Sequence, residues 1–501
     1  MNRALYTVIG LGLLTIIILA NVSSANSLPP SSATQPNIVF IRTDDQDFQT
    51  FFDKLPNGRP VMKNVRELIM RRGTYFDRSY VSFPLCCPSR ATTLTGQYAH
   101  NHTVLSNGGS TGGYAKLNHT NTLPIWLGQA GYYTMHLGKY MNGYNVVLDP
   151  SGSYHAPPAG WNKWFTTFGN MHKYYNYSVY DGTNVVTYGS SASDYQTDVI
   201  TRQAQDYLTQ RPYENQPFFM QVDYLAPHED LSMGNNPPPA APRHQGLMSG
   251  SSLPMSPAFN EADVSDKAIF ISYLPPLTSQ DIAEVKNNYE HRMESLLAVD
   301  EGVGKILQTL RATGQYGNTI VVFTSDNGFM LGEHRKSGKF LAYESLRVPL
   351  IMSGPSIPKG KIVPELVMNV DLTPTFLEWA SATPGLLQDG RSLVPLLTNP
   401  TGTTSWRSDI LTENPLVNYY RGLRTYNVST GREYLYTEYD YTNDGVVDEK
   451  ELFALTPDSC RPVGDPYLLE SQHANPCYSS LIQQFHNRVT YLKTCAGSTC
   501  T

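Results

Sequence analysis

Two short apolar segments, each followed by acidic or amide residues, constrain the fold of this 501-residue chain most. Residues 37–41 read NIVFI and residues 319–323 read TIVVF, and neither segment alternates between polar and apolar side chains. Continuous apolar runs of this length are typical of parallel strands buried on both faces of a sheet. The polar residues that come just after the two predicted strands are Asp44, Asp45, Asp326 and Asn327.

Helical patterns between and after these strands indicate an α/β domain with helices layered on a sheet. The predicted helices span residues 65–72, 197–210, 279–313 and 372–382. Residues 234–276 are rich in proline and predict a long irregular surface insertion.

After residue 400 the pattern changes to β-hairpins, with strands predicted at 432–438 and 452–455, and a last helix at 478–492. We therefore predict a large catalytic domain over residues 37–398 and a small C-terminal α+β subdomain over residues 399–501.

The first residues have the features of a secretory signal peptide. Arg3 precedes an apolar stretch at 8–20, and the small residues 23–25 form a cleavage site, so we predict a signal peptide at 1–25 and a linker at 26–36. The alternative, a membrane anchor, needs a longer apolar run of about 20 residues. We predict no stable membrane span and a mature protein in the secretory pathway, either extracellular or lysosomal. Glycosylation sequons begin at Asn101, Asn118, Asn176 and Asn427.

Cysteine placement agrees with an oxidising compartment. Four of the six cysteines lie close together at the C-terminus, where three pairings are formally open. The short loops favour Cys460–Cys477 and Cys495–Cys500. Cys86 and Cys87 are adjacent, and adjacent cysteines pair only with strain.

The charge of the chain excludes one class of partner. Its formal net charge is −6 and only 16% of its residues are charged. Such a chain has no overall positive field to hold a phosphate backbone, so we predict no nucleic-acid partner.

The polar residues after the two predicted strands suggest a metal site. Ligand sites in open α/β sheets form beyond the carboxyl ends of strands. Three carboxylates and one amide oxygen suit Ca²⁺ or Mg²⁺ better than Zn²⁺. Each pair alone could simply cap a turn, but two pairs after similar strands favour a metal.

The sharpest local motif is the segment 85–96, LCCPSRATTLTG. Pro88 suits a first helical position, which predicts that Cys86 lies just before a helix N-terminus. Free backbone N–H groups at that end favour an anion, and the Arg90 guanidinium adds a fork for a tetrahedral oxyanion. The alternative is a buried cysteine pair with a purely structural role.

Cys86-x-Pro88-x-Arg90 followed by Leu94-Thr95-Gly96 resembles the signature of the sulfatases, in which the first cysteine is oxidised to formylglycine. Further segments that match this family in order begin at Asn37, Asp44, Gly138, Ala226, Ser325, Gly332, Gly338, Arg347, Asp371 and Asp389. Within the family the chain is most similar to N-acetylglucosamine-6-sulfatases and arylsulfatases. The resemblance implies an alkaline-phosphatase-like fold, with a large mixed or parallel sheet between helices.

The resemblance also implies a mechanism and its site residues. One Ca²⁺ would be held by Asp44, Asp45, Asp326, Asn327 and the modified side chain of Cys86. The aldehyde hydrate at position 86 would attack sulfur, and the metal and Arg90 would stabilise the charge. Lys139 and Lys339 would bind sulfate oxygens, and His228 would protonate the leaving alcohol. The implied partners are a sulfated carbohydrate or aryl sulfate, and a formylglycine-generating enzyme during maturation.

One position departs from the pattern of many sulfatases. They carry a histidine two residues after the first lysine, where this chain has Met141. The base that deprotonates the second hydroxyl therefore stays open, with His334 a stronger candidate for an active-site neighbour than His100 or His102.

Two rival functions follow from other observations. A phosphodiester or phosphonate hydrolase could use the same formylglycine and metal. Residues 440–451 have the spacing of an EF-hand loop, which would suit a calcium-dependent extracellular binding module. The flanks of that loop are strand-like, however, so we predict a hairpin turn at residues 443–445.

Overall fold

The computed structural model describes residues 35–144, 157–169, 171–210, 212–213, 216–231, 236–339, 342–398, 406–416 and 418–501. The predicted signal peptide and nearly all of the predicted linker lie outside these residues. Residues Gln35–Thr501 cluster into one compact unit, and the predicted boundary at 398/399 adjoins residues outside the description, so it stays a prediction. In the described ranges, no helix combines the length and the apolar character that crossing a membrane would take.

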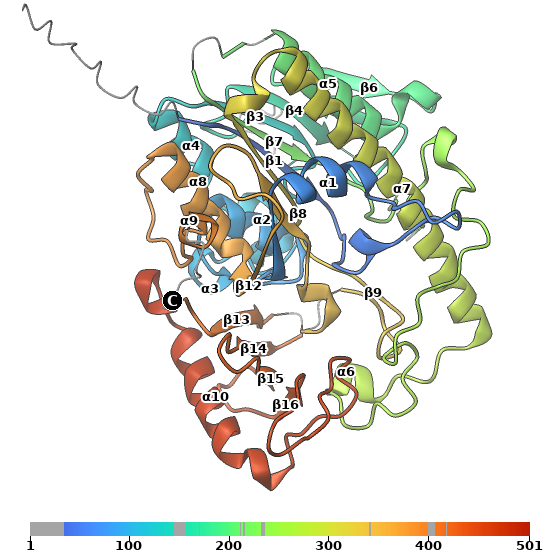
Figure 1. Cartoon of the computed structure of the whole chain (residues 1–501), viewed down its shortest axis with the longest axis vertical. Helices are drawn as coiled ribbons and strands as arrows, with labels where there is room; N and C mark the ends of the chain where they lie inside the picture. The colour runs from blue at the N-terminus through green and yellow to red at the C-terminus, as the bar shows by residue number, and fades with distance from the viewer. Residues whose placement is uncertain are drawn as a thin grey trace, which may run out of the picture. The chain divides into compact units, whose positions relative to one another are not determined.

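A ten-stranded mixed sheet forms the centre of the molecule (Figure 1). Its strand order is β12-β2-β11-β8-β1-β7-β3-β4-β5-β6. Strand β1 pairs in parallel with both β7 and β8, whereas β11 pairs antiparallel with β8 and β2, and β5 antiparallel with β4 and β6. The strands are β1 (Asn37–Thr43), β2 (Thr74–Tyr80), β3 (Tyr133–Gly138), β4 (Lys163–Phe168), β5 (Tyr177–Tyr180), β6 (Val185–Tyr188), β7 (Phe218–Asp223), β8 (Thr319–Ser325), β11 (Leu350–Ser353) and β12 (Lys361–Met368).

Helices cover both faces of this sheet because successive strand residues point to opposite sides. Val39 and Ile41 of β1 pack into the same core as helices α1, α5 and α7, while Ile38 and Phe40 pack into the core under α4, α8 and α9 (Figure 1). The predicted layered α/β fold is confirmed. The covering helices are α1 (Lys63–Leu68), α5 (Gln196–Gln210), α7 (Ser279–Ala312), α4 (Leu123–Gln129), α8 (Leu372–Ala380) and α9 (Val394–Thr398).

The predicted helices occur at their expected places with small differences at the ends. Helix α7 begins where predicted because Thr278 and Asp281 form a capping box. The helix predicted for 65–72 begins two residues earlier and ends at Leu68, after which a separate 3-10 turn spans Met70–Arg72. The predicted irregular insertion contains the short helix α6 (Ile269–Ser272).

The C-terminal subdomain consists of a second, antiparallel sheet and one helix. Its strands are β13 (Asp409–Asn414), β14 (Tyr420–Tyr426), β15 (Glu433–Tyr439) and β16 (Glu449–Ala454), and its helix is α10 (Ser479–Leu492). Strands β15 and β16 flank residues 440–448 as an antiparallel hairpin, which confirms the strand flanks expected there. Both favoured disulfides, Cys460–Cys477 and Cys495–Cys500, are present, and Cys86 and Cys87 are free and buried.

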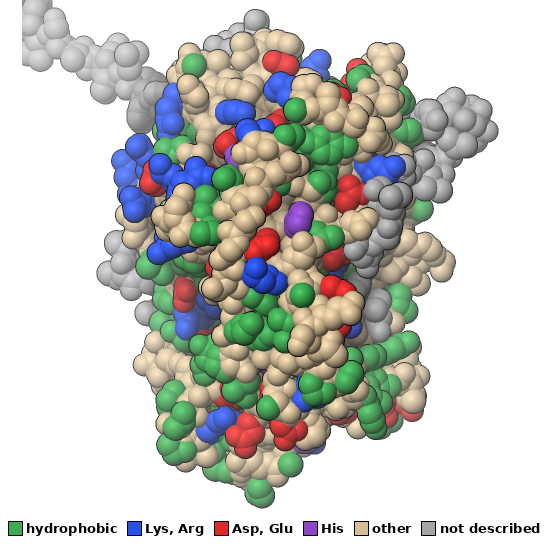
Figure 2. Space-filling view, turned by 90° about the vertical axis from the view of Figure 1, so that its right-hand side faces the viewer, with side chains coloured by type: hydrophobic (Ala, Val, Ile, Leu, Met, Phe, Trp, Pro, Cys, Tyr) green, Lys and Arg blue, Asp and Glu red, His purple; other side chains and the backbone are tan. Residues whose placement is uncertain are grey.

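The molecular surface is sparsely charged, as the composition implies. On the face in Figure 2 Lys and Arg side chains gather toward the left of the upper half, and much of the remaining face is uncharged.

The four sequons differ in their surroundings. Asn101, in the short helix α3 (Ala99–His102), donates from Nδ2 to Asp389 Oδ2 at 2.8 Å and to the Cys495 carbonyl oxygen at 2.9 Å. Asn118, Asn176 and Asn427 are exposed. The Nδ2 atom to which a glycan would be attached is therefore already engaged only at Asn101 among these four.

We predict that the protein, made in a host that glycosylates secreted proteins, carries glycans at Asn118, Asn176 and Asn427 and none at Asn101. The physical reason is that a glycan on Asn101 would break both hydrogen bonds and separate α3 from the C-terminal segment. Glycopeptide mass spectrometry measures site occupancy. High occupancy of Asn101 in folded protein would contradict the prediction.

Candidate active site

The acidic and amide residues predicted to follow two strands do converge. Strands β1 and β8 pair in parallel with Thr43 opposite Ser325, so the residues after both strands leave the sheet at the same edge. The Asp45 backbone N–H donates to Asp326 Oδ1 at 3.1 Å, and Asn327 Nδ2 donates to Asp45 Oδ1 at 2.7 Å. Asp44, Asp45, Asp326 and Asn327 are each at most 1% exposed.

Helix α2 (Cys86–Thr95) brings the cysteine motif to this edge. The prediction that Pro88 is the first helical residue is wrong, because the helix begins at Cys86 and Leu85 is its N-cap. Pro88 is the third helical residue, where its missing N–H still costs no intrahelical hydrogen bond. The first N–H that donates within the turn belongs to Ser89, which bonds the Leu85 carbonyl.

Arg90 lies between the carboxylates of the two strands. Its Nε donates to Asp326 Oδ2 at 2.8 Å, and its Nη2 donates to Asp44 Oδ2 at 3.0 Å. Its Nη1 donates to the carbonyl oxygens of Lys139 and Tyr140. Burial opposes the charge, but the two carboxylates raise the pKa of Arg90 above its usual value. The guanidinium therefore holds both aspartates in fixed positions.

Two lysines face Cys86 from different parts of the chain. Lys139, just after β3, contacts Asp44 and lies 3.7 Å from Cys86 Sγ through its Nζ. Lys339 contacts Asp45, and its Nζ lies 3.2 Å from the same sulfur. Burial alone would raise the pKa of Asp44, but the Lys139 ammonium holds it well below the usual range.

The Cys86 side chain is a poor thiol nucleophile in this environment. It is fully buried, and burial raises the pKa of its thiol to about 12. A thiol with such a pKa is almost entirely protonated at neutral pH, whereas the thiolate is the reactive form. The sulfur nevertheless lies 3.5 Å from Asp44 Oδ1 and near both ammonium groups, at the centre of the cluster.

The donor set fits a hard divalent cation. One ligand atom from each of Asp44, Asp45, Cys86 and His228 lies within 4.8 Å of the others. Asn327 Oδ1 is buried and has no hydrogen-bond partner among the described residues, so a buried oxygen is left for a cation. Carboxylate and amide oxygens are the ligands of Ca²⁺ and Mg²⁺.

His228 lies in the same cluster. Its Nε2 is 3.7 Å from Asp45 Oδ2, and its Nδ1 donates to the Glu229 carbonyl oxygen at 2.7 Å. Because Nδ1 is engaged in this way, Nε2 is the nitrogen that faces the site. Burial lowers the pKa of His228 to about 4.

Two further residues of the site were not predicted. His172 stacks on His228, with ring centroids 4.9 Å apart, and Asp223 lies 3.5 Å from Arg90 and forms a buried pair with Arg42. Asp223 ends β7, so the same signal that identified Asp44, a carboxylate at a strand end, applies to it. His172 lies outside the helices and strands, and no sequence motif marks it.

The other candidate histidines bond elsewhere. His334 Nδ1 bonds Glu261 at 2.6 Å, and its partner raises the pKa of His334 to about 9 against the effect of burial. His100 bonds Glu413 and the Cys495 carbonyl oxygen, and His102 bonds Thr92. Met141 is fully buried in an apolar cluster.

Comparison with known proteins places the chain in a family. The model of the family "Sulfatase" matches residues 36–382, and that of "N-sulphoglucosamine sulphohydrolase, C-terminal" matches residues 332–494. The N-acetylglucosamine-6-sulfatase of Homo sapiens is 35% identical over 388 residues, covering 76% of this chain and 67% of that protein. The enzyme of the same name from Capra hircus is 34% identical and covers 76% and 66%. This chain thus spans about two thirds of the length of these relatives.

Solved structures agree on the fold. The structure of BT4656 in complex with its substrate D-glucosamine-2-N,6-O-disulfate has a TM-score of 0.71 at 25% identity, covering 91% of this chain and 97% of that one. The phosphonate monoester hydrolase of Agrobacterium radiobacter has a TM-score of 0.66 at 18% identity, covering 91% and 95%, which is a likeness of fold alone. With the family models and the curated relatives, these results show that the chain belongs to the sulfatase family and is a sulfuric ester hydrolase.

Proposed function

We propose that this sulfatase hydrolyses the sulfate monoester of a sugar or of an aryl alcohol through the hydrate of a formylglycine made from Cys86. One Ca²⁺ would be held by Asp44, Asp45, Asp326, Asn327 and residue 86. The observation that carries the proposal is the position of Cys86: its sulfur lies within 3.7 Å of Lys139, Lys339 and Asp44 together.

The proposed formylglycine hydrate and Ca²⁺ would supply a nucleophile and positive charge at this edge of the sheet. A hydrated aldehyde offers a hydroxyl nucleophile that the protonated thiol lacks, and Ca²⁺ offers positive charge for sulfate oxygens. The Lys139 and Lys339 ammonium groups bind the remaining sulfate oxygens and stabilise negative charge that develops there. Arg90 contributes by fixing Asp44 and Asp326, to which it is hydrogen-bonded.

The leaving alcohol needs a proton on the other side of sulfur. His228 Nε2 faces the cluster while Nδ1–H donates to the Glu229 carbonyl, so Nε2 has a proton to give to the alcohol oxygen only when the ring is an imidazolium. Burial disfavours that form, and the Asp45 carboxylate 3.7 Å away favours it. The stacked His172 ring limits the positions that the His228 ring can adopt.

A sulfated carbohydrate is the substrate class that the relatives support. Both named curated relatives are N-acetylglucosamine-6-sulfatases, and one similar structure contains a disulfated glucosamine. The proposal includes a secretory route, with extracellular or lysosomal residence, and oxidation of Cys86 by a formylglycine-generating enzyme. Turnover of matched sulfate and phosphonate esters would separate it from a phosphonate hydrolase.

Replacing Cys86 tests the nucleophile. We expect Cys86→Ala to abolish sulfate ester hydrolysis while the thermal unfolding midpoint stays close to that of the wild type, because the change removes a single sulfur atom. Mass spectrometry of the active wild-type peptide that contains residue 86 should show an aldehyde or its hydrate. A fully active enzyme with an unmodified thiol at position 86 would refute the mechanism.

Replacing Asp326 tests the metal. We expect Asp326→Asn to lose most of the bound Ca²⁺ and at least a hundredfold in kcat/KM, because one charged ligand is removed and the hydrogen bond with Arg90 weakens. Bound Ca²⁺ is measured by atomic emission after dialysis. Asp206→Asn, an exposed aspartate in α5, is the matched control and should keep both. Stoichiometric Ca²⁺ in the Asp326 variant would remove this residue from the ligand set.

Replacing His228 tests the acid. A sugar alkoxide is a poor leaving group, so a positioned acid should contribute about 10²–10⁴-fold, whereas a phenolate needs the proton much less. We expect His228→Ala to reduce kcat for a sugar sulfate far more than kcat for p-nitrophenyl sulfate. Equal losses for the two esters would exclude His228 from the acid role.

A further inference from the structure

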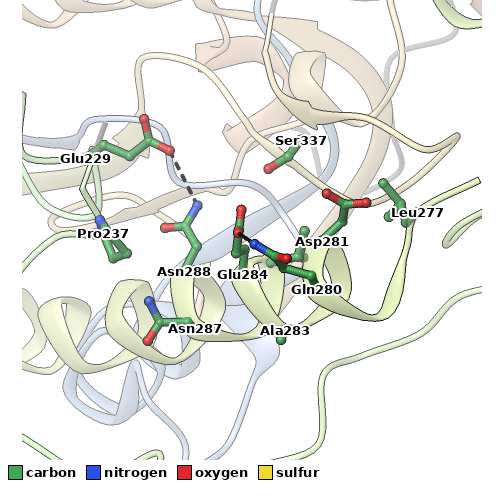
Figure 3. A pocket seen from close by; sticks show the side chains of 11 residues that line it. Glu229, Pro237, Leu277, Gln280, Asp281, Ala283, Glu284, Asn287, Asn288 and Ser337 are labelled. Carbon is green, nitrogen blue, oxygen red and sulfur yellow. Dashed lines mark hydrogen bonds between the residues drawn. The ribbon is translucent and has the colours of Figure 1, made fainter. Parts of the chain in front are cut away.

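A cavity of about 640 Å³ lies along the first turns of α7 (Figure 3). This volume is in the range of pockets that bind small molecules. Besides α7, its wall contains Glu229 and Ser337, and these side chains point toward those of α7 in Figure 3. The polar lining residues on α7 are Gln280, Asp281, Glu284, Asn287 and Asn288.

Two residues of the cavity wall are chain neighbours of residues in the proposed active site. Glu229 directly follows His228 and accepts its Nδ1 hydrogen through the backbone carbonyl. Ser337 precedes Lys339 by two residues, and both lie on the segment that brings the lysine to Cys86. Burial raises the pKa of Glu229, and the charges of Asp45 and Lys339 also act on its carboxyl group, so this wall of the cavity is within electrostatic reach of the site.

One buried oxygen atom in the cavity wall, Asn288 Oδ1, lacks a hydrogen-bond donor in the described part of the chain. Asn288 is 9% exposed, and its Nδ2 donates to Glu229 Oε1 at 3.4 Å. Its Oδ1 has no hydrogen-bond partner in the described part of the chain. A buried acceptor without a donor is unfavourable, so a ligand that brings a hydroxyl or N–H group would be stabilised there.

The charge of the wall is of one sign. Glu229, Asp281 and Glu284 are acidic, and none of the described lining residues is Lys or Arg. Asp281 is occupied by the helix cap, and Glu284 Oε1 accepts from Gln280 Nε2 at 3.1 Å. The remaining carboxylate oxygens offer acceptors only, so they favour hydroxyl or amine donors and repel a sulfate or carboxylate.

We propose that this α7 cavity is the subsite for the sugar that carries the sulfate ester, and that it selects sugars without a second anionic group. This inference rests on the proposed function and names the substrate class within it: neutral or amino sugars bearing one sulfate, rather than highly sulfated or uronate-containing chains. The scissile sulfate lies with the lysines, and the hydroxyl groups of the ring lie against Asn288, Glu229 and Glu284.

The test compares three substrates on the full-length mature enzyme. N-acetylglucosamine 6-sulfate carries one sulfate, glucosamine 2-N,6-O-disulfate carries two, and p-nitrophenyl sulfate lacks a sugar. We expect wild-type kcat/KM to be at least about tenfold higher for the monosulfated than for the disulfated sugar. Equal or better use of the disulfated sugar would overturn the selection.

Two variants locate the effect. Asn288→Ala should lower the ratio of kcat/KM for the monosulfated sugar to that for p-nitrophenyl sulfate by about tenfold, the loss of one hydrogen bond. Glu284→Gln, at an exposed position, should narrow the preference for the monosulfated sugar several-fold by removing one repulsive charge. Glu378→Gln on α8, across the sheet, removes the same charge from an exposed position and should leave that preference unchanged.

The outcomes separate this inference from the proposed function. If Asn288→Ala lowers kcat/KM for the sugar and the aryl sulfate by the same factor, the subsite is refuted while sulfatase activity stands. If the wild type hydrolyses no sulfate ester, the proposed function fails, and saturation-transfer NMR with sulfate-free N-acetylglucosamine decides the subsite. Transfer that is present in the wild type and lost in Asn288→Ala supports the subsite, and no transfer in the wild type overturns it.

Discussion

The neutralisation of buried carboxylates at one sheet edge is the interaction on which the rest of this site depends. Asp44, Asp45 and Asp326 are removed from water, and isolated buried charges are strongly unfavourable. Arg90, Lys139 and Lys339 supply the opposite charges at contact distance. These cations come from α2, from the residue after β3 and from the residue after the short strand β10 (Ser337–Gly338), so the charge balance fixes three separate segments around one point.

The C-terminal subdomain supports this arrangement from outside. Glu451 occupies the last acidic position of the EF-hand-like spacing. It lies in β16 and is fully buried, so it is not part of an exposed loop. It accepts hydrogen bonds from Tyr343 at 2.6 Å, Tyr439 at 2.8 Å and the Ala268 backbone at 2.8 Å. Because Tyr343 lies four residues after Lys339, the second sheet anchors the segment that carries a proposed sulfate-binding lysine. The earlier acid Asp440 is likewise used within the chain, accepting the Gly445 N–H of the hairpin turn.

The sequence predicted the parts of the molecule whose signals are local. Strands β1 and β8 are continuous apolar runs, and α7 has a capping box, so their positions follow from a few neighbouring residues. Strands β11 and β12 were not predicted, because their pairing with β2 and β8 depends on contacts made far along the chain. The same distinction applies to the site. Asp44 and Asp326 follow recognisable strands, whereas His172 and the wall formed by Glu229 and Asn288 exist only once the loops have packed on α7.

Cys86 is completely buried in the folded chain, and this has a consequence for how the protein is made. Strand β8, which closes the site against β1, is synthesised more than two hundred residues after Cys86. During that interval the cysteine motif has left the ribosome but the structure that encloses it cannot yet form. If Cys86 is oxidised as proposed, the oxidising enzyme would have to reach it on the nascent chain, before β8 pairs with β1, and a molecule that folded unmodified would lack the proposed nucleophile.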